Sequence, residues 1–156
     1  SQLLDHEIRE CLRLSKRINI DLKSFVFPGG TLGNYRVLAE NGFLCYRKPN
    51  HFQIDMPYID DYGLVVIPSS HQLEKDRFNW SRSFHLKILE KFIIKTAEYK
   101  QVCHFWFHPS MDEWYLNNVL PELLEMVNKF REKKIIEVLT MSELAQKYRN
   151  EFNNRI

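Results

Sequence analysis

The sequence has no long hydrophobic run and little excess of charge of either sign. No stretch approaches the ~18 continuous apolar residues of a membrane-spanning helix, so we expect no membrane span. Lysines and arginines number 22 against 20 aspartates and glutamates, a net charge of +2. This balance is too small to indicate a nucleic-acid partner. The first residues carry neither the basic head nor the apolar core of a signal peptide, which favours a cytoplasmic location.

Cysteine is also scarce, with only Cys11, Cys45 and Cys103 in 156 residues. An odd number cannot all pair, and their spacing does not match a zinc knuckle. Each lies in an apolar run, so we expect buried, reduced thiols. Hydrophobic residues make up 44% and charged residues 27%, as is typical of a globular protein. We therefore expect residues 1–156 to form a single domain.

Helical and strand-like patterns alternate along the chain. Apolar residues at helical spacing predict helices over 3–18, 83–99, 113–132 and 141–152, and a short helix from Tyr35 that is capped by Gly42. Short apolar runs predict strands over 24–27, 43–46, 63–68, 102–107 and 135–139, and residues 47–61 and 69–81 are expected to be irregular. Strands that are apolar on both faces indicate an α/β fold with a mainly parallel sheet and flanking helices.

Candidate site residues follow from this pattern, because active sites of parallel α/β folds lie at the carboxyl ends of the strands. Pro28, Gly29 and Gly30 follow the first predicted strand, Arg47 follows the second and His71 follows the third. His108 ends the fourth strand directly before a proline, so its imidazole can be held rigidly at the mouth of a site. The alternative is a structural, hydrogen-bonded histidine.

Other polar features have simpler explanations. The glycines near residue 30 fit neither a Walker loop nor a dinucleotide fingerprint, and a tight turn explains them. Asp112 and Glu113 are favourable charges for the first turn of the helix that follows. Thr140 and Glu143 have the spacing of a capping box for the last helix.

Several segments taken together resemble the C-terminal half of the polysaccharide deacetylase family, the chitooligosaccharide-deacetylase-like carbohydrate esterases. The resemblance covers about residues 7–148 and rests on SFVFPGG (24–30), LAENGFLCYR (38–47), GLVVIP (63–68), CHFWFHPS (103–110) and VLTMSELA (138–145). It implies part of a distorted (β/α) barrel and the hydrolysis of an acetyl group from an N-acetylated sugar or polysaccharide. It further implies a divalent metal, usually zinc, that activates water.

The resemblance also assigns roles to residues of this chain. His108 matches the late histidine that serves as general acid for the leaving amine. Pro28 and Gly30 match the motif that forms one wall of the substrate groove, with Gly29 between them. Trp106 is a candidate for stacking on a sugar ring, although core packing is the alternative. The predicted substrate-binding residues are Pro28, Gly29, Gly30, Arg47, His71 and Trp106.

The chain departs from the family pattern where the metal should bind. Val26 stands where the family has an arginine that orients the base. The family's Asp-Asp pair and His-x3-His precede this point, but only 23 residues precede Ser24 here, with the single histidine His6. We therefore expect no zinc ligands, an N-terminal metal-binding half missing from this chain, and no activity of this chain alone. The chain would pair with that half or form a homo-oligomer; the alternative is a non-catalytic module for glycan binding or assembly.

Overall fold

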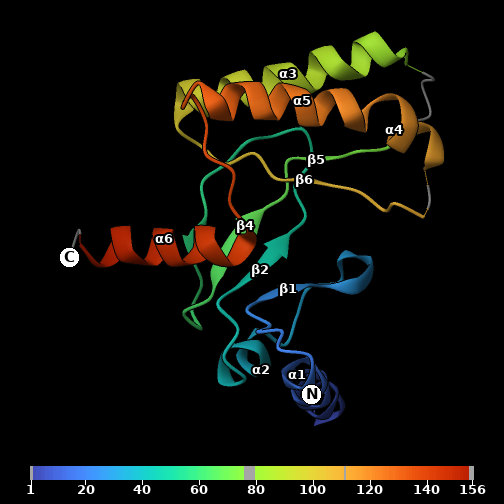
Figure 1. The fold of residues 1–156 in the computed structure, drawn as a ribbon. Coiled ribbons are helices and arrows are strands. Elements are labelled where there is room, and N and C mark those ends of the chain that lie inside the picture. The colour runs from blue at the N-terminus through green and yellow to red at the C-terminus, as the bar shows by residue number, and fades with distance from the viewer. Residues whose placement is uncertain (1, 76–79, 111, 155–156) are drawn as a thin grey trace. The chain divides into compact units, whose positions relative to one another are not determined.

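A computed structural model describes residues 2–75, 80–110 and 112–154 and divides the chain into two compact units (Figure 1). The first unit comprises Ser1–Pro49, Pro57–Ile67 and Leu139–Ile156. The second comprises Asn50–Met56 and Pro68–Val138. Each unit has apolar clusters formed from its own residues. No helix of the described residues is long and apolar enough to cross a membrane.

The first unit is built on a four-stranded, mostly parallel sheet with the order β1-β2-β4-β3. Its strands are β1 (Ser24–Val26), β2 (Cys45–Lys48), β3 (Tyr58–Ile59) and β4 (Val65–Pro68). β1 and β2 are parallel and place Val26 beside Arg47, whereas β3 runs antiparallel to β4. The predicted α/β class and mostly parallel sheet are confirmed in this unit.

Helices of the first unit cover both faces of this sheet. Tyr46 and Val66 point into a cluster with residues of α1 (Gln2–Arg17) and α2 (Tyr35–Glu40). The neighbouring Cys45 and Val65, both fully buried, point the other way and pack against α6 (Met141–Asn153). The alternation explains why these short strands are apolar throughout, since side chains point to opposite faces at each step.

The ends of these helices follow the sequence closely. Thr140 and Glu143 form the predicted capping box at the start of α6. α2 ends as the N–H of Gly42 donates to the carbonyl of Ala39 and that of Phe43 to Leu38. Gly42 has φ +82°, a conformation that glycine adopts readily and that stops the helix there.

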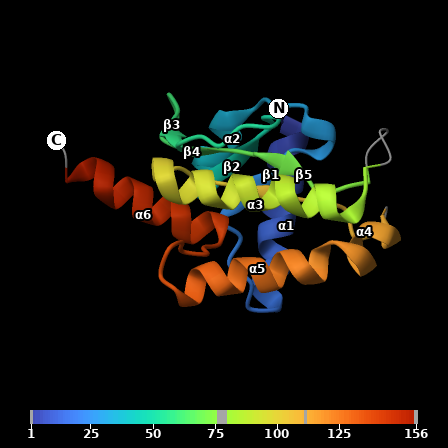
Figure 2. The same ribbon diagram turned by 90° about the horizontal axis from the view of Figure 1, so that it is seen from above.

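The second unit packs helices on a pair of short parallel strands, β5 (His71–Gln72) and β6 (Phe105–Trp106). α3 (Arg82–Tyr99) and α5 (Leu120–Glu132) run alongside each other, as Figures 1 and 2 both show. A shorter helix, α4 (Glu113–Asn118), precedes α5. The core of this unit joins Leu73 beyond β5 to Leu89 and Ile93 of α3 and Leu123 of α5.

Two predicted elements of the second unit are wrong. The single helix over 113–132 is broken at Val119, because Pro121 has no N–H and its ring would clash with the carbonyl one turn earlier. The strand over 135–139 does not form, although it was expected to be the fifth strand. Lys134 has φ +57°, and the N–H of Ile135 donates to the carbonyl of Phe130. The start of the segment is therefore part of the turn that ends α5.

Smaller differences concern short strands and one thiol. The strand expected over 102–107 is reduced to β6, and β3 and β5 lie within segments expected to be irregular. Residues 76–79 of the segment 69–81 lie outside the described residues. Cys45 is buried and Cys103 is half-buried, but Cys11 is exposed, which corrects the expectation of three buried thiols. Cys11 lies about one helical turn after the buried Ile8 of α1 but is itself exposed, so the helical spacing of the apolar residues did not reveal its exposure.

Candidate functional site

A small hollow lies beyond the carboxyl ends of β5 and β6 in the second unit, and His108 lines it. The hollow has a volume of about 140 Å³ and is formed by Gln72, Leu73, Glu74, Lys75, His108 and Asp112. The two strands are parallel, so the segments that follow them emerge at the same edge. The N–H of Leu73 donates to the carbonyl of Trp106 (2.8 Å) and extends the pairing to this edge.

Asp112 ties the two sides of the hollow together. One carboxylate oxygen accepts the backbone N–H of Lys75 (2.5 Å), and the other accepts that of Tyr115 (2.8 Å). Asp112 is thus the N-cap of α4 and also holds the segment after β5. The sequence indicated a favourable first-turn charge, but it did not show that this carboxylate reaches Lys75, 37 residues away.

The His108 side chain is exposed, and its ring meets the half-buried indole of Trp106 edge to face (centroids 5.4 Å apart). Trp106 lies at the end of β6, and the two side chains are two positions apart along an extended segment, which places them on one side. The structure therefore brings together two of the predicted site residues, Trp106 and His108.

The charges around the hollow are nearly balanced. Lys75 and His108 can supply positive charge, and Glu74 and Asp112 supply negative charge. The Lys75 ammonium also lies 4.9 Å from the centroid of the Trp114 ring, where a cation is favoured by the electrons of the indole face. Such a hollow is polar without a dominant sign, which suits a neutral ligand rich in hydrogen-bonding groups.

His71 lies on β5 but does not line this hollow. Its ring lies 4.7 Å from that of Phe52 and is stacked on Phe92 at 5.8 Å, with an angle of 10° between the planes. The next residue, Gln72, lines the hollow instead, since successive side chains of a strand point to opposite sides. Gln72, Lys75 and Asp112 are site residues that the sequence did not single out.

The remaining predicted site residues lie in the first unit. Pro28, Gly29 and Gly30 form an exposed single-turn helix after β1, with Gly29 at φ +62° and Gly30 at φ +71°, and so provide the tight turn considered from the sequence. Arg47 on β2 is half-buried, and burial lowers the pKa of its guanidinium. These residues belong to the first unit, and His108 belongs to the second.

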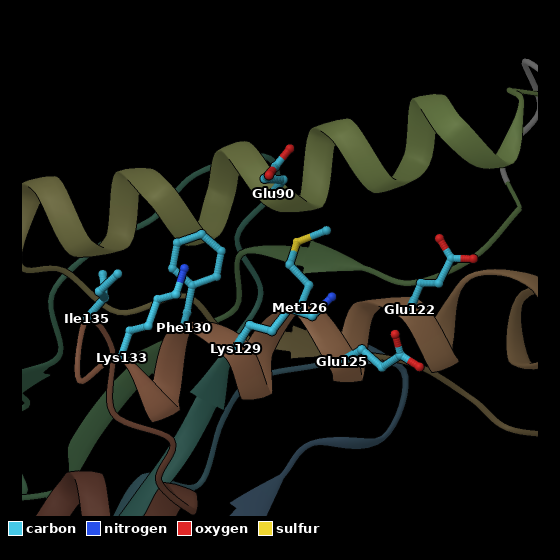
Figure 3. Close-up of a pocket in the computed structure, with 8 residues that line it drawn as sticks. All are labelled: Glu90, Glu122, Glu125, Met126, Lys129, Phe130, Lys133 and Ile135. Carbon is cyan, nitrogen blue, oxygen red and sulfur yellow. The ribbon is translucent and has the colours of Figure 1, made fainter.

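A larger groove lies between α3 and α5, with a volume of about 640 Å³. Figure 3 shows Met126 and Phe130 pointing from α5 toward α3, with charged side chains on either side. Glu122 there is paired with Arg82 at the start of α3. Apolar contacts between helices and paired surface charges account for this groove, and none of the predicted site residues lines it.

The resemblance implies a zinc ion, which needs several donor side chains close together. Among residues 2–75, 80–110 and 112–154, no group of three or more histidine, cysteine, aspartate or glutamate side chains is placed to hold a metal ion. Both carboxylate oxygens of Asp112 already accept backbone N–H groups. The described residues thus do not fit a zinc ion at this hollow.

No family model, curated protein or solved structure matches this chain.

Proposed function

We propose that the hollow at His108 binds an acetamido group of a glycan and that the chain is a polysaccharide deacetylase-like protein. The observation that carries the proposal is the place of His108, exposed at the end of β6 in a polar hollow of about 140 Å³. This volume is below the ~300–1,000 Å³ that encloses a drug-sized ligand, so the hollow suits one substituent of a sugar ring. Its balanced charges suit a neutral amide.

His108 is the residue that would supply acid catalysis. Hydrolysis of an acetamido group adds water to the carbonyl carbon and breaks the C–N bond, and the departing amine must gain a proton. An imidazolium at the edge of the hollow can donate that proton to the nitrogen. The neutral imidazole left behind then takes up the proton that the added water loses, so that the products are acetic acid and the free amine. Asp112 is a positioning residue in this proposal, because its two oxygens hold Lys75 and Tyr115 in place.

The second candidate is a glycan-binding module without catalysis. Asp112 favours it, because a carboxylate that already accepts two backbone N–H groups is poorly placed to take a proton from water. In this case the hollow would hold the acetamido group and no bond would be broken. The parent barrel, its metal-binding half and any self-association remain predictions from the resemblance.

The test is binding and deacetylation of triacetylchitotriose by the chain, with and without added Zn²⁺. Calorimetry measures binding, and the release of acetate measures hydrolysis. If His108 is the acid, His108→Gln should lower the hydrolysis rate by ~10²–10⁴-fold and change binding little. The matched control is His6→Gln, because His6 is an exposed histidine on α1.

The outcomes separate the candidates. Binding without acetate release from the unmodified chain favours the binding module, and Asp112→Ala should then weaken binding by releasing the Lys75 segment. Asp112→Asn should weaken it less, since an amide oxygen can still accept an N–H. Neither binding nor hydrolysis with Zn²⁺ present would overturn both candidates.

A further inference from the structure

A second groove of the same unit is separate from the hollow at His108 and differs from it in chemistry. It has a volume of about 620 Å³ and lies between the segment Asn50–Met56 and α3. Its walls include Phe52, Ile54, Lys91, Phe92, Lys95 and Tyr99. The volume falls within the range that encloses a small organic molecule.

The wall formed by Asn50–Met56 is fixed at both ends. At one end the N–H of Asn50 donates to the hydroxyl of Ser69 (3.0 Å), and this hydroxyl donates back to the carbonyl of Asn50 (3.1 Å). At the other end Asp55 and Val102 exchange backbone hydrogen bonds of 3.3 and 3.1 Å. The intervening side chains are therefore presented on a short, tethered segment and not on a free loop.

Phe52 is the unusual residue of this wall. Its φ is +55°, a left-handed conformation that is rare for a bulky side chain, and 58% of the residue is exposed. Strained backbone of this kind is concentrated at functional sites, where the surrounding structure maintains it. Phe92, which is buried, and Tyr99, which is 64% exposed, add two further rings to the groove.

Two lysines give the groove a single sign of charge. Lys91 and Lys95 are one helical turn apart on α3, where like charges repel each other. No aspartate or glutamate is among the described residues that line the groove, and neither lysine forms an ion pair with a described residue. An anion between the two ammonium groups would remove the repulsion.

We propose that this groove binds an aromatic carboxylate, with its ring against Phe52, Phe92 and Tyr99 and its carboxylate between Lys91 and Lys95. Aromatic rings favour edge-to-face and offset contacts with one another, which selects a ring over an aliphatic chain. The two cations select an acid over a neutral molecule. The site is independent of the hollow at His108, with which it shares no lining residue.

The test is calorimetric titration of the whole chain with 2-naphthoate, with 2-naphthamide and octanoate as comparison ligands. 2-Naphthoate should bind at least ten-fold more tightly than either comparison ligand. The double variant Lys91→Gln, Lys95→Gln and the single variant Phe52→Ala should each weaken it at least ten-fold. The matched control is Lys87→Gln, because Lys87 is an exposed lysine one turn earlier on α3 and does not line the groove.

Three results would overturn the proposal. The first is no detectable binding of 2-naphthoate, and the second is equal binding of the amide, which would mean a non-selective apolar surface. The third is retention of full affinity by the double lysine variant while its circular dichroism is unchanged. His108→Gln should leave 2-naphthoate binding unchanged, so failure here is distinguishable from failure of the glycan proposal.

Discussion

The two units of this protein use the ends of parallel strands in different ways. In the first unit, β1 ends in an exposed glycine turn and β2 carries a half-buried arginine, while β2 and β4 are covered by helices on both faces. In the second unit, β5 and β6 are only two residues long and end at a polar hollow beside an exposed histidine. The expectation that active sites lie at the carboxyl ends of parallel strands thus leads to a turn in one unit and to a candidate site in the other. Strand ends indicate where an active site can lie, but the charge and burial of the residues there decide whether a site is present.

The largest expected effect separates the exposed thiol of Cys11 from the less accessible thiol that each unit contains. Burial raises the pKa of Cys45 in the first unit and of Cys103 in the second to about 12. Since the thiolate is the reactive form, we expect iodoacetamide at pH 8 to modify exposed Cys11 at least ~100-fold faster than either. Mass spectrometry of the alkylated chain measures the three rates. Equal rates at all three cysteines would contradict the described burial.

Each of the two slowly alkylated thiols lies in a different unit, so its alkylation rate reports on the stability of that unit. A core substitution can therefore be assigned to the unit that it destabilises. Leu89→Ala removes a fully buried side chain from the core of the second unit and should cost about 2–5 kcal/mol of its stability. Denaturant unfolding followed by tryptophan fluorescence measures this loss, because Trp80, Trp106 and Trp114 all belong to the second unit. Alkylation of Cys103 should accelerate more than that of Cys45.

The control for this substitution is Leu124→Ala on α5. Leu124 is 58% exposed, whereas the neighbouring Leu123 is buried. Its removal should change stability by no more than ~0.5 kcal/mol. A cost as large as that of Leu89→Ala would show that the face of α5 is assigned wrongly.

The same contrast explains what could be predicted from the sequence. Apolar residues that recur at helical spacing over ten or more positions predicted α1, α3 and α6. The capping box marked the start of α6, whose N-cap is Thr140. β3 and β5 could not be found, because a two-residue strand has no periodicity and is defined only by its partner. The strand predicted from IIEVL failed because the turn after α5 takes its first residue.

The residues of the candidate site also divide into those that the sequence could predict and those that it could not. His108 could be predicted, since it ends an apolar run before a proline. Asp112 and Lys75 could not, because their contact joins residues that are 37 positions apart. His71 was predicted to follow the strand over 63–68 in an irregular segment, whereas it begins β5, and its direction depends on the register of β5, which the sequence does not reveal.

A smaller effect is expected from the cap of α6 in the first unit. Thr140→Ala removes the hydroxyl that accepts the N–H of Glu143 (3.2 Å) and should cost about 0.5–2 kcal/mol. The Sγ of Cys45 lies 3.5 Å from the carbonyl oxygen of Met141 in α6, so fraying of this helix should accelerate alkylation of Cys45. Ser142→Ala is the matched control, and it should leave the rate within about two-fold of the original. An unchanged rate in Thr140→Ala would mean that the first turn of α6 does not protect this thiol.

The smallest effect is the titration of Glu143 in the same cap. The backbone N–H of Thr140 donates to its carboxylate (2.7 Å), the Thr140 hydroxyl adds a second hydrogen bond, and together they lower the pKa of Glu143 below its ordinary 4.5. Because the folded pKa is the lower one, this carboxylate stabilises the folded chain above about pH 4.5 and loses that contribution as the pH falls through the folded value. An NMR titration of the Glu143 side chain should therefore show a midpoint below 4.5. Thr140→Ala should raise it only part of the way, since the larger contribution comes from the backbone N–H, which the variant keeps. A midpoint at 4.5 in the unmodified chain would mean that the capping box is open in solution, and the protection of Cys45 would then have another cause.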